Sequence, residues 1–273
     1  MWRLLMVKCH HHRKWKFNND FAVSIFLLKF AIYNNDRQYM TGIHRYLPGD
    51  RMADLISENY FLIQVISRFG IKVGFGDKTV EQVCREFGVD CATFLAVVNF
   101  IVQGHSYIDG STELSIPSLL NYLKQSHIYF LEFCLPAIRR KLLNGIVLST
   151  DNVSFLIMKF FDDYTAEVKT HMEFEEQKVF SYVRGLLSGS IEDKFRITTY
   201  SEYHEEVGDK LKELKNIIIK YCPDSADINL LNDALYDIYR CEQELESHCM
   251  VEDRIFVPAV VKLERKVRED VQR

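Results

Sequence analysis

The chain has 273 residues, of which 48% are hydrophobic and 26% charged, a composition typical of a folded globular protein. Proline and glycine are sparse, with 5 and 12 residues, and 13% of the residues are aromatic, which excludes disorder over most of the chain. Lys and Arg number 34 against 38 Asp and Glu, and the formal net charge of −4 argues against a nucleic-acid-binding protein.

The seven cysteines are scattered and form no Cys-x-x-Cys pair. Their odd number and their spacing favour neither a disulfide framework nor a zinc ribbon. We therefore expect a reducing, cytoplasmic compartment.

Residues 1–39 differ from the rest of the chain. A basic start precedes an apolar run from Phe21 to Tyr33, which is shorter than the roughly 20 residues needed to span a bilayer. No small-residue cleavage site follows this run, as a signal peptide would require. We expect residues 1–39 to be an over-extended or disordered leader, with Met40 as the natural start. A membrane-attached leader is the alternative.

Residues 40–104 are predicted to form a small helical domain with three short helices. The first spans 53–69 and ends at Gly70, which suits a left-handed C-terminal stop. Thr79 caps the second helix in a capping box with a glutamine three residues later, and Asp90 caps the third. No basic recognition helix is present, so DNA binding is not expected.

Residues 113–273 show four long amphipathic segments, separated by polar or glycine-containing breaks near 144–152, 188–193 and 222–227. Apolar residues recur at steps of three and four along each segment, which is the helical period. Pro117 suits a first helical turn, and Pro136 should bend its helix. The pattern predicts an all-α protein whose C-terminal part is an antiparallel four-helix bundle.

Each apolar stripe of the bundle carries one histidine, and two stripes also carry a glutamate four residues after it. Residues four apart lie on the same helix face. Successive histidines are 44, 33 and 44 residues apart, which places them at similar height in an up-down-up-down bundle. The six candidate metal ligands are His127, His171, Glu175, His204, His248 and Glu252.

A metal site explains this set better than isolated core residues do. A lone histidine on an apolar stripe is usually a hydrogen-bonded core residue, and a lone His-x-x-x-Glu pair can simply stabilise a helix. Two carboxylates among apolar neighbours are different, because burying each one uncompensated costs several kcal/mol. A bound cation would relieve that cost.

Imidazole and carboxylate ligands without thiolate suit iron, manganese or zinc. Two bridging carboxylates in a bundle favour two ions about 3.5–4 Å apart. Two iron ions need about twelve donor contacts, and four His, two bridging Glu and an oxo or hydroxo bridge supply about ten. About two positions would then stay open for dioxygen, nitric oxide or peroxide.

The six residues resemble the ligands of the hemerythrin-like di-iron bundle. Further segments are similar to the family that repairs iron–sulfur centres after nitrosative and oxidative stress. These segments are 66–71 and 77–84 in the N-terminal part, and 135–136 and 256–258 in the bundle. The resemblance covers about residues 50–265.

The resemblance implies two non-haem iron ions joined by an oxo or hydroxo bridge. Glu175 and Glu252 would bridge the ions. His127 and His171 would serve mainly one ion, and the other two histidines of the set the second ion. No catalytic residue is assigned.

Two departures from the related family stand out. Where the family carries Cys-Cys-Gly-Gly, this chain has Gly74-Phe75-Gly76-Asp77, and we expect Cys84 and Cys91 to be structural. A fifth histidine is also missing, because Gly208 follows His204 by four residues and residues 128–170 contain no histidine. His105 in the linker is not expected to replace it, so one iron should keep an open or water-filled position.

We expect a stress-response protein that helps to repair iron–sulfur clusters. Its partners would be a small gaseous or peroxide ligand and iron–sulfur proteins, without nucleic acid or membrane, and a homodimer is compatible with the sequence. The alternative is a non-enzymatic sensor of dioxygen or nitric oxide. A peroxidase-like or oxidase-like enzyme ranks third, because no residue marks an organic substrate pocket.

Overall fold

The described part of the chain consists of α-helices, three short π-helical segments and one 3₁₀ turn, η4 (Ile197–Thr199), so the all-α prediction is confirmed. One isolated antiparallel bridge joins Arg51 and Thr79. The computed structural model describes residues 45–103, 113–146, 152–190, 195–199, 207–222 and 226–271. The expectations for residues 1–39, His105 and His204 therefore lie outside the described residues.

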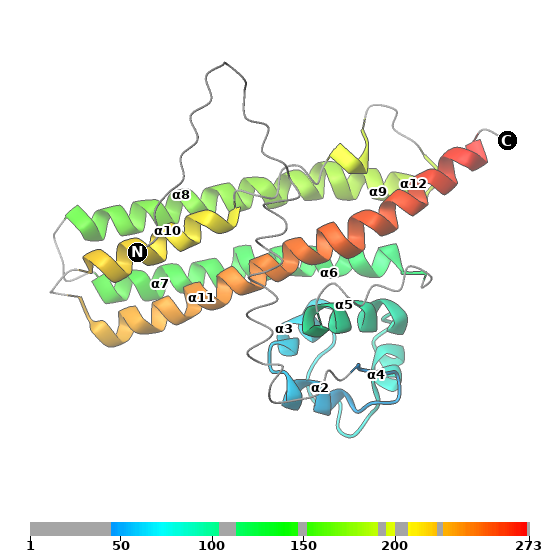
Figure 1. The fold of residues 1–273 in the computed structure, drawn as a ribbon, viewed down its shortest axis with the longest axis horizontal. Helices are drawn as coiled ribbons and strands as arrows, with labels where there is room; N and C mark the ends of the chain where they lie inside the picture. The colour runs from blue at the N-terminus through cyan, green and yellow to red at the C-terminus, as the bar shows by residue number, and fades with distance from the viewer. Residues whose placement is uncertain are drawn as a thin grey trace, which may run out of the picture. The chain divides into compact units, whose positions relative to one another are not determined.

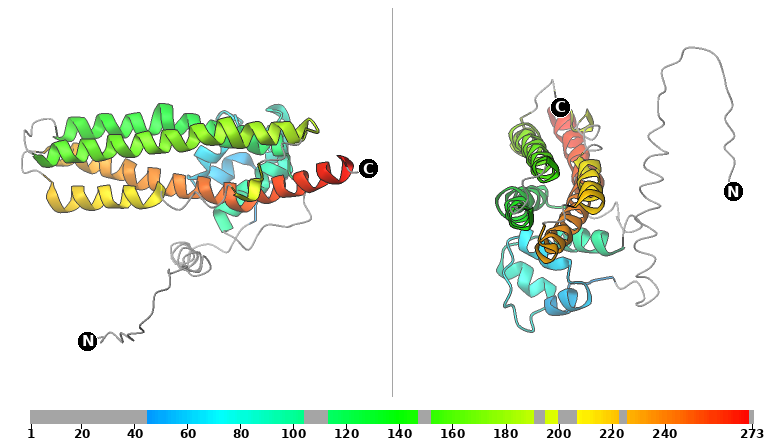
Figure 2. Two further views of the ribbon diagram at one scale, coloured as in Figure 1. Left: turned by 90° about the horizontal axis from the view of Figure 1, so that it is seen from above. Right: turned by 90° about the vertical axis from the view of Figure 1, so that its left-hand side faces the viewer.

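Four helical rods form the predicted antiparallel bundle (Figures 1 and 2). The first rod is α6 (Ile116–Ile128), η2 (Tyr129–Cys134) and α7 (Leu135–Ile146), and the second is α8 (Asn152–Phe174), η3 (Glu175–Val179) and α9 (Phe180–Leu187). The third is α10 (Val207–Tyr221), and the fourth is α11 (Ile228–Val251), η6 (Glu252–Phe256) and α12 (Val257–Val271). Neighbouring rods meet along α7 and α8, α8 and α10, α10 and α11, and α11 and α7.

Local sequence signals fix the starts of two rods. Pro117 lies in the first turn of α6 as predicted, and Ser115 caps that helix by accepting from the backbone N–H of Ser118. Asp227 caps α11 by accepting from the backbone N–H groups of Asn229 and Leu230. These caps satisfy donors that the first turn of a helix leaves without an intrahelical partner.

Three of the four rods contain a π-helical segment at the level of the predicted ligands. η2 begins two residues after His127, while η3 and η6 begin at Glu175 and Glu252. Pro136 and Pro258 follow η2 and η6 closely, and a proline cannot donate the backbone hydrogen bond of a regular α-turn. Single π turns inside α-helices are rare and occur frequently at functional sites.

The apolar stripes of the rods meet in a continuous core. Ile157, Tyr164, Leu211, Leu214 and Ile238 are among its fully or almost fully buried members. Each buried methylene stabilises the fold by about 0.8 kcal/mol, so this core supplies the main driving force for bundle formation.

The N-terminal part contains four short helices, α2 (Met52–Glu58), α3 (Leu62–Arg68), α4 (Val80–Glu86) and α5 (Cys91–Gln103). The single helix predicted over 53–69 is divided in two, because Asn59 leaves the helical conformation with φ −144° and ψ 91°. The corner also lets Leu55 and Leu62 be fully buried together.

The other local predictions for this part are confirmed. Gly70 has a φ of +79° just after α3, a left-handed conformation that glycine adopts without strain. Thr79 and Gln82 form the complete capping box of α4. Asp90 accepts from the backbone N–H of Thr93 at 2.8 Å at the start of α5.

The short helices pack on the bundle, and Arg45–Arg273 form one compact unit. The guanidinium of Arg68 in α3 lies 2.7 Å from the Glu244 carboxylate in α11, and both side chains are at least 92% buried. Phe69 packs against Tyr122 of α6 with ring centroids 4.9 Å apart. No helix in the described ranges is both long and apolar enough to cross a membrane.

Candidate metal centre

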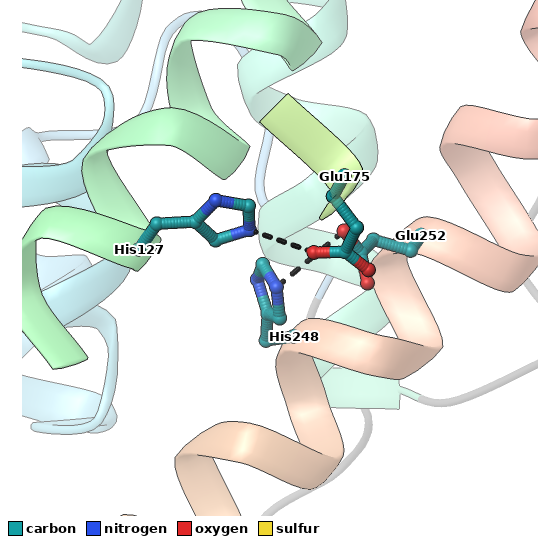
Figure 3. Close-up of side chains that lie close together, drawn as sticks. All are labelled: His127, Glu175, His248 and Glu252. Atoms are coloured by element: carbon teal, nitrogen blue, oxygen red, sulfur yellow. Dashed lines mark ion pairs between the residues drawn. The ribbon is translucent and has the colours of Figure 1, made fainter. Parts of the chain in front are cut away.

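Four polar side chains converge inside the bundle (Figure 3). His127 comes from α6, Glu175 from the start of η3, His248 from α11 and Glu252 from the start of η6. One potential ligand atom from each residue lies within 4.8 Å of all the others. The four residues are 0–2% exposed, so they form a buried interior cluster.

The carboxylate of Glu175 joins two imidazoles from different rods. Its Oε2 lies 3.1 Å from Nε2 of His127, and its Oε1 lies 2.9 Å from Nε2 of His171. Across the cluster, Nε2 of His248 lies 3.4 Å from Oε1 of Glu252. Glu175 therefore presents one oxygen toward each of two nitrogen ligands, the arrangement needed for a bridging carboxylate.

The structure brings four of the six predicted ligands into one compact cluster. His171 contacts Glu175 but stands at the edge of the cluster, with 18% of its side chain exposed. His204 lies outside the described residues. Metal binding by the six residues stays a prediction.

Aromatic rings enclose the cluster. The ring of Phe180 stacks on the imidazole of His127 with centroids 5.4 Å apart, and Phe130 meets His248 edge to face at 5.9 Å. These rings pack against the buried imidazoles, and the low polarity of such surroundings strengthens electrostatic interactions inside the site.

The donor set fits a transition-metal ion. Imidazole nitrogens with carboxylate oxygens suit iron, manganese and zinc, and a cation would compensate the two buried carboxylates. Desolvation and the carboxylates of Glu252 and Glu175 raise the pKa of the nearby Cys249 thiol well above its usual range. In the metal-free protein this thiol is therefore protonated and neutral.

Sequence reasoning missed Glu176. Its Oε1 lies 3.1 Å from Nδ1 of His127, on the side of the ring opposite the cluster. A sequence signal was present, because an acidic residue directly follows each glutamate of the cluster: Glu176 follows Glu175, and Asp253 follows Glu252.

The loop over residues 74–77 is a glycine-dependent turn. Gly74 and Gly76 have φ values of +102° and +60°, and Phe75 between them is buried. Burial raises the pKa of the Cys84 thiol, which hydrogen-bonds with the thiol of Cys91. This environment agrees with the expectation of structural rather than reactive cysteines.

The fold and the site together define a helical bundle with an interior histidine–carboxylate site for a cation. The family described as hemerythrin HHE cation binding domain matches residues 118–260, just over half of the chain. The chain therefore belongs to this family. No curated protein matches the chain.

Proposed function

We propose that this protein is a non-haem di-iron protein of the nitrosative and oxidative stress response that takes part in the repair of damaged iron–sulfur clusters. The observation that carries the metal assignment is Glu175, whose two oxygens face imidazoles from two rods at the centre of the bundle. The repair role rests on the sequence resemblance to the repair family.

In this proposal Glu175 and Glu252 would be the carboxylates shared by the two ions. His127 and His171 hold mainly one ion, and His204 and His248 mainly the other. When bound, the ions supply open coordination positions for a small ligand such as nitric oxide, dioxygen or peroxide. The protein contributes fixed ligands and the rings of Phe130 and Phe180, which pack against the buried imidazoles.

The test is the iron content and the ultraviolet–visible spectrum of the purified full chain. We expect about two iron ions per chain, and loss of most of the iron in the double variant Glu175→Ala with Glu252→Ala. Glu173→Ala is the matched control, because Glu173 is an exposed residue of α8 that faces Lys169 at the surface. Absence of iron from the wild type, or unchanged iron in the double variant, would refute the proposal.

A second candidate function is a sensor of nitric oxide or dioxygen. Two observations favour it: glycine and phenylalanine occupy the positions of the family's thiol pair, and Arg68 ties α3 to Glu244, four residues before the ligand His248. Through this ion pair, a shift of α11 at the metal site would be passed to the N-terminal helices.

The two functions are distinguished by incubating the iron-loaded protein with a nitrosylated iron–sulfur enzyme. Recovery of that enzyme's activity, with loss of iron from this protein, supports repair. Reversible spectral changes with nitric oxide, without any recovery of the enzyme, support sensing. We propose a cytoplasmic location for either role, in keeping with the buried thiols of Cys84, Cys134 and Cys241.

A further inference from the structure

We propose that Glu176 is a positioning residue of the metal site, whose carboxylate fixes the tautomer and orientation of His127. This inference rests on the proposed metal-binding function. Glu176 is not a ligand in this proposal, because its side chain contacts the imidazole on the side away from the cluster.

The imidazole of His127 lies between two consecutive carboxylates. Nδ1 is 3.1 Å from Oε1 of Glu176, and Nε2 is 3.1 Å from Oε2 of Glu175. Only the contact of Nδ1 with Glu176 has hydrogen-bond geometry, whereas Nε2 makes no hydrogen bond despite its closeness to Glu175. Because an ionised carboxylate only accepts hydrogen bonds, the bond to Glu176 places a proton on Nδ1. In the neutral ring the lone pair is then on Nε2, the nitrogen that faces the cluster.

The same contact restrains the ring in space. The ring of Phe180 lies nearly parallel to the imidazole, at 13°, with the two centroids 5.4 Å apart. Stacking alone permits the ring to slide or rotate in its own plane. The hydrogen bond from Nδ1 to Glu176 removes that freedom, because it anchors one edge of the ring while the opposite edge faces the cluster.

The backbone of η3 explains how two neighbouring residues take different roles. Glu175 and Glu176 lie in its first turn, and consecutive helical residues point to different sides. The Glu175 side chain is fully buried, whereas that of Glu176 is 38% exposed. Glu175 thus faces the interior of the bundle. Glu176 lies at the edge of the cluster, where its carboxylate contacts His127 of α6.

Hydrogen-bonding partners of this kind raise the basicity of a ligating imidazole, and their loss typically weakens metal affinity about 10–100-fold. We expect Glu176→Ala to weaken Fe²⁺ binding within this range. Glu176→Gln keeps an oxygen acceptor for Nδ1 and should lose less affinity than Glu176→Ala. The control Glu173→Gln also removes one acidic charge from the same rod and should bind Fe²⁺ like the wild type.

The test has two measurements on the full chain. The first is anaerobic titration of the metal-free protein with Fe²⁺ alone. The second is the tautomer of His127 in the metal-free protein, from long-range proton–nitrogen correlations of the imidazole at a pH where the ring is neutral. We expect the Nδ1–H tautomer in the wild type and in Glu176→Gln, and a shift toward Nε2–H in Glu176→Ala.

The tautomer measurement separates this inference from the proposed function. A wild type that fails to bind Fe²⁺ would refute the metal assignment, while its tautomer would still support or refute the role of Glu176. An Nδ1–H tautomer that persists in Glu176→Ala would overturn the inference. So would equal losses of affinity in Glu176→Ala and Glu173→Gln. If Glu176→Ala does not fold, the wild type alone decides, because a His127 ring found there as Nε2–H also overturns the inference.

Discussion

At the scale of single residues, three buried carboxylates in the described part of the chain lie beside an imidazole or a guanidinium. Glu175 and Glu252 face imidazoles, and Glu244 faces the guanidinium of Arg68. Burial raises the pKa of Glu244 and outweighs the opposing effects of Arg68 and Arg240. The ion pair therefore compensates the desolvation of this carboxylate only in part.

The raised pKa of Glu244 predicts a pH dependence of stability. The folded protein binds this proton more tightly than the unfolded chain does, so the stabilisation from Glu244 is greatest at low pH. It is lost as the pH rises from the unfolded-state pKa of about 4.3 through the raised pKa of the folded state. We expect the unfolding free energy of the wild type to fall relative to that of Glu244→Gln over this range, as measured by urea unfolding.

Glu264 provides a control of opposite sign. Its burial raises the pKa, but hydrogen bonds from Arg196 and Arg268 prevail and lower it. Its stabilisation is therefore present above the unfolded-state pKa and lost as the pH falls through the lowered pKa. The unfolding free energy of the wild type relative to each variant should therefore change with pH in opposite directions for Glu244→Gln and Glu264→Gln. A change in the same direction for both variants would contradict the raised pKa of Glu244 and the lowered pKa of Glu264.

The sequence most readily reveals those site residues that follow the period of a single helix. His171 and Glu175 share a face, as do His248 and Glu252, and spacing of four residues is enough to find both pairs. The contact of His127 with Glu176 joins residues 49 apart, and that of Arg68 with Glu244 joins residues 176 apart. Such contacts depend on the register between helices, which helical periodicity does not determine.

At the scale of the elements, the close approach of α7 to α11 depends on a glycine. A Cβ at Gly145 would lie 3.2 Å from the backbone nitrogen of Leu231. That backbone has little freedom to move. The backbone N–H of Leu231 donates to the carbonyl oxygen of Asp227, and the backbone N–H of Asp227 donates to the carbonyl oxygen of Gly145 itself. A Cβ at Gly185 in α9 would have more space, since the nearest atom it would meet is the Ser190 carbonyl oxygen at 3.7 Å.

These two glycines give a matched pair of substitutions. Gly145→Ala should destabilise the protein by about 1–3 kcal/mol, because the added methyl group forces the two helices apart. Gly185→Ala should be neutral or stabilise by up to about 1 kcal/mol, because alanine favours the helix without a clash. Urea unfolding of both variants measures the difference, and a Gly145→Ala variant as stable as Gly185→Ala would disprove the tight contact.

The attachment of α3 to the bundle gives another prediction. Arg68→Ala leaves the buried Glu244 carboxylate without its main partner and should destabilise the protein by about 3–5 kcal/mol. The control is the exposed pair of Arg139 and Asp162, where Arg139→Ala should cost about 1 kcal/mol or less. The double variant Arg68→Met with Glu244→Leu should recover much of the loss, because no unpaired charge then remains buried.

The boundaries of the helices were less predictable than their existence. The apolar period runs through Asn59 without a break, since Leu55 and Leu62 both fit one helix, and the corner between α2 and α3 depends on the backbone of Asn59. The long rods were predictable because their stripes extend over several turns. The π segments were not, because an extra residue within one turn is too small a change in period to detect in a short stretch.

At the scale of the whole molecule, metal binding and folding are predicted to be coupled. The ligands come from elements that are far apart in the sequence, so the unfolded chain lacks the site. A ligand that binds only the folded state, present at about 100 times its Kd, stabilises that state by about 2.7 kcal/mol. We expect Fe²⁺ to raise the Tm of the wild type and to leave that of Glu175→Ala with Glu252→Ala unchanged.

Circular dichroism is the suitable probe for this measurement, because the described part of the chain is largely α-helical. Because the short helices and the bundle form one compact unit, a single transition should be observed with and without the metal. Equal shifts in the wild type and the double variant would show that Fe²⁺ binds elsewhere.

The three π segments have a consequence for the local opening of the bundle. They lie at one level of three neighbouring rods, so the regular backbone hydrogen bonding is interrupted at the level of the predicted ligands. Amide protons at this level should exchange with deuterium earlier than those one turn away on either side, although the side chains of His127, Glu175 and Glu252 there are deeply buried. Metal binding should slow that exchange selectively, which makes the middle of the rods, rather than their ends, the most responsive part of the backbone.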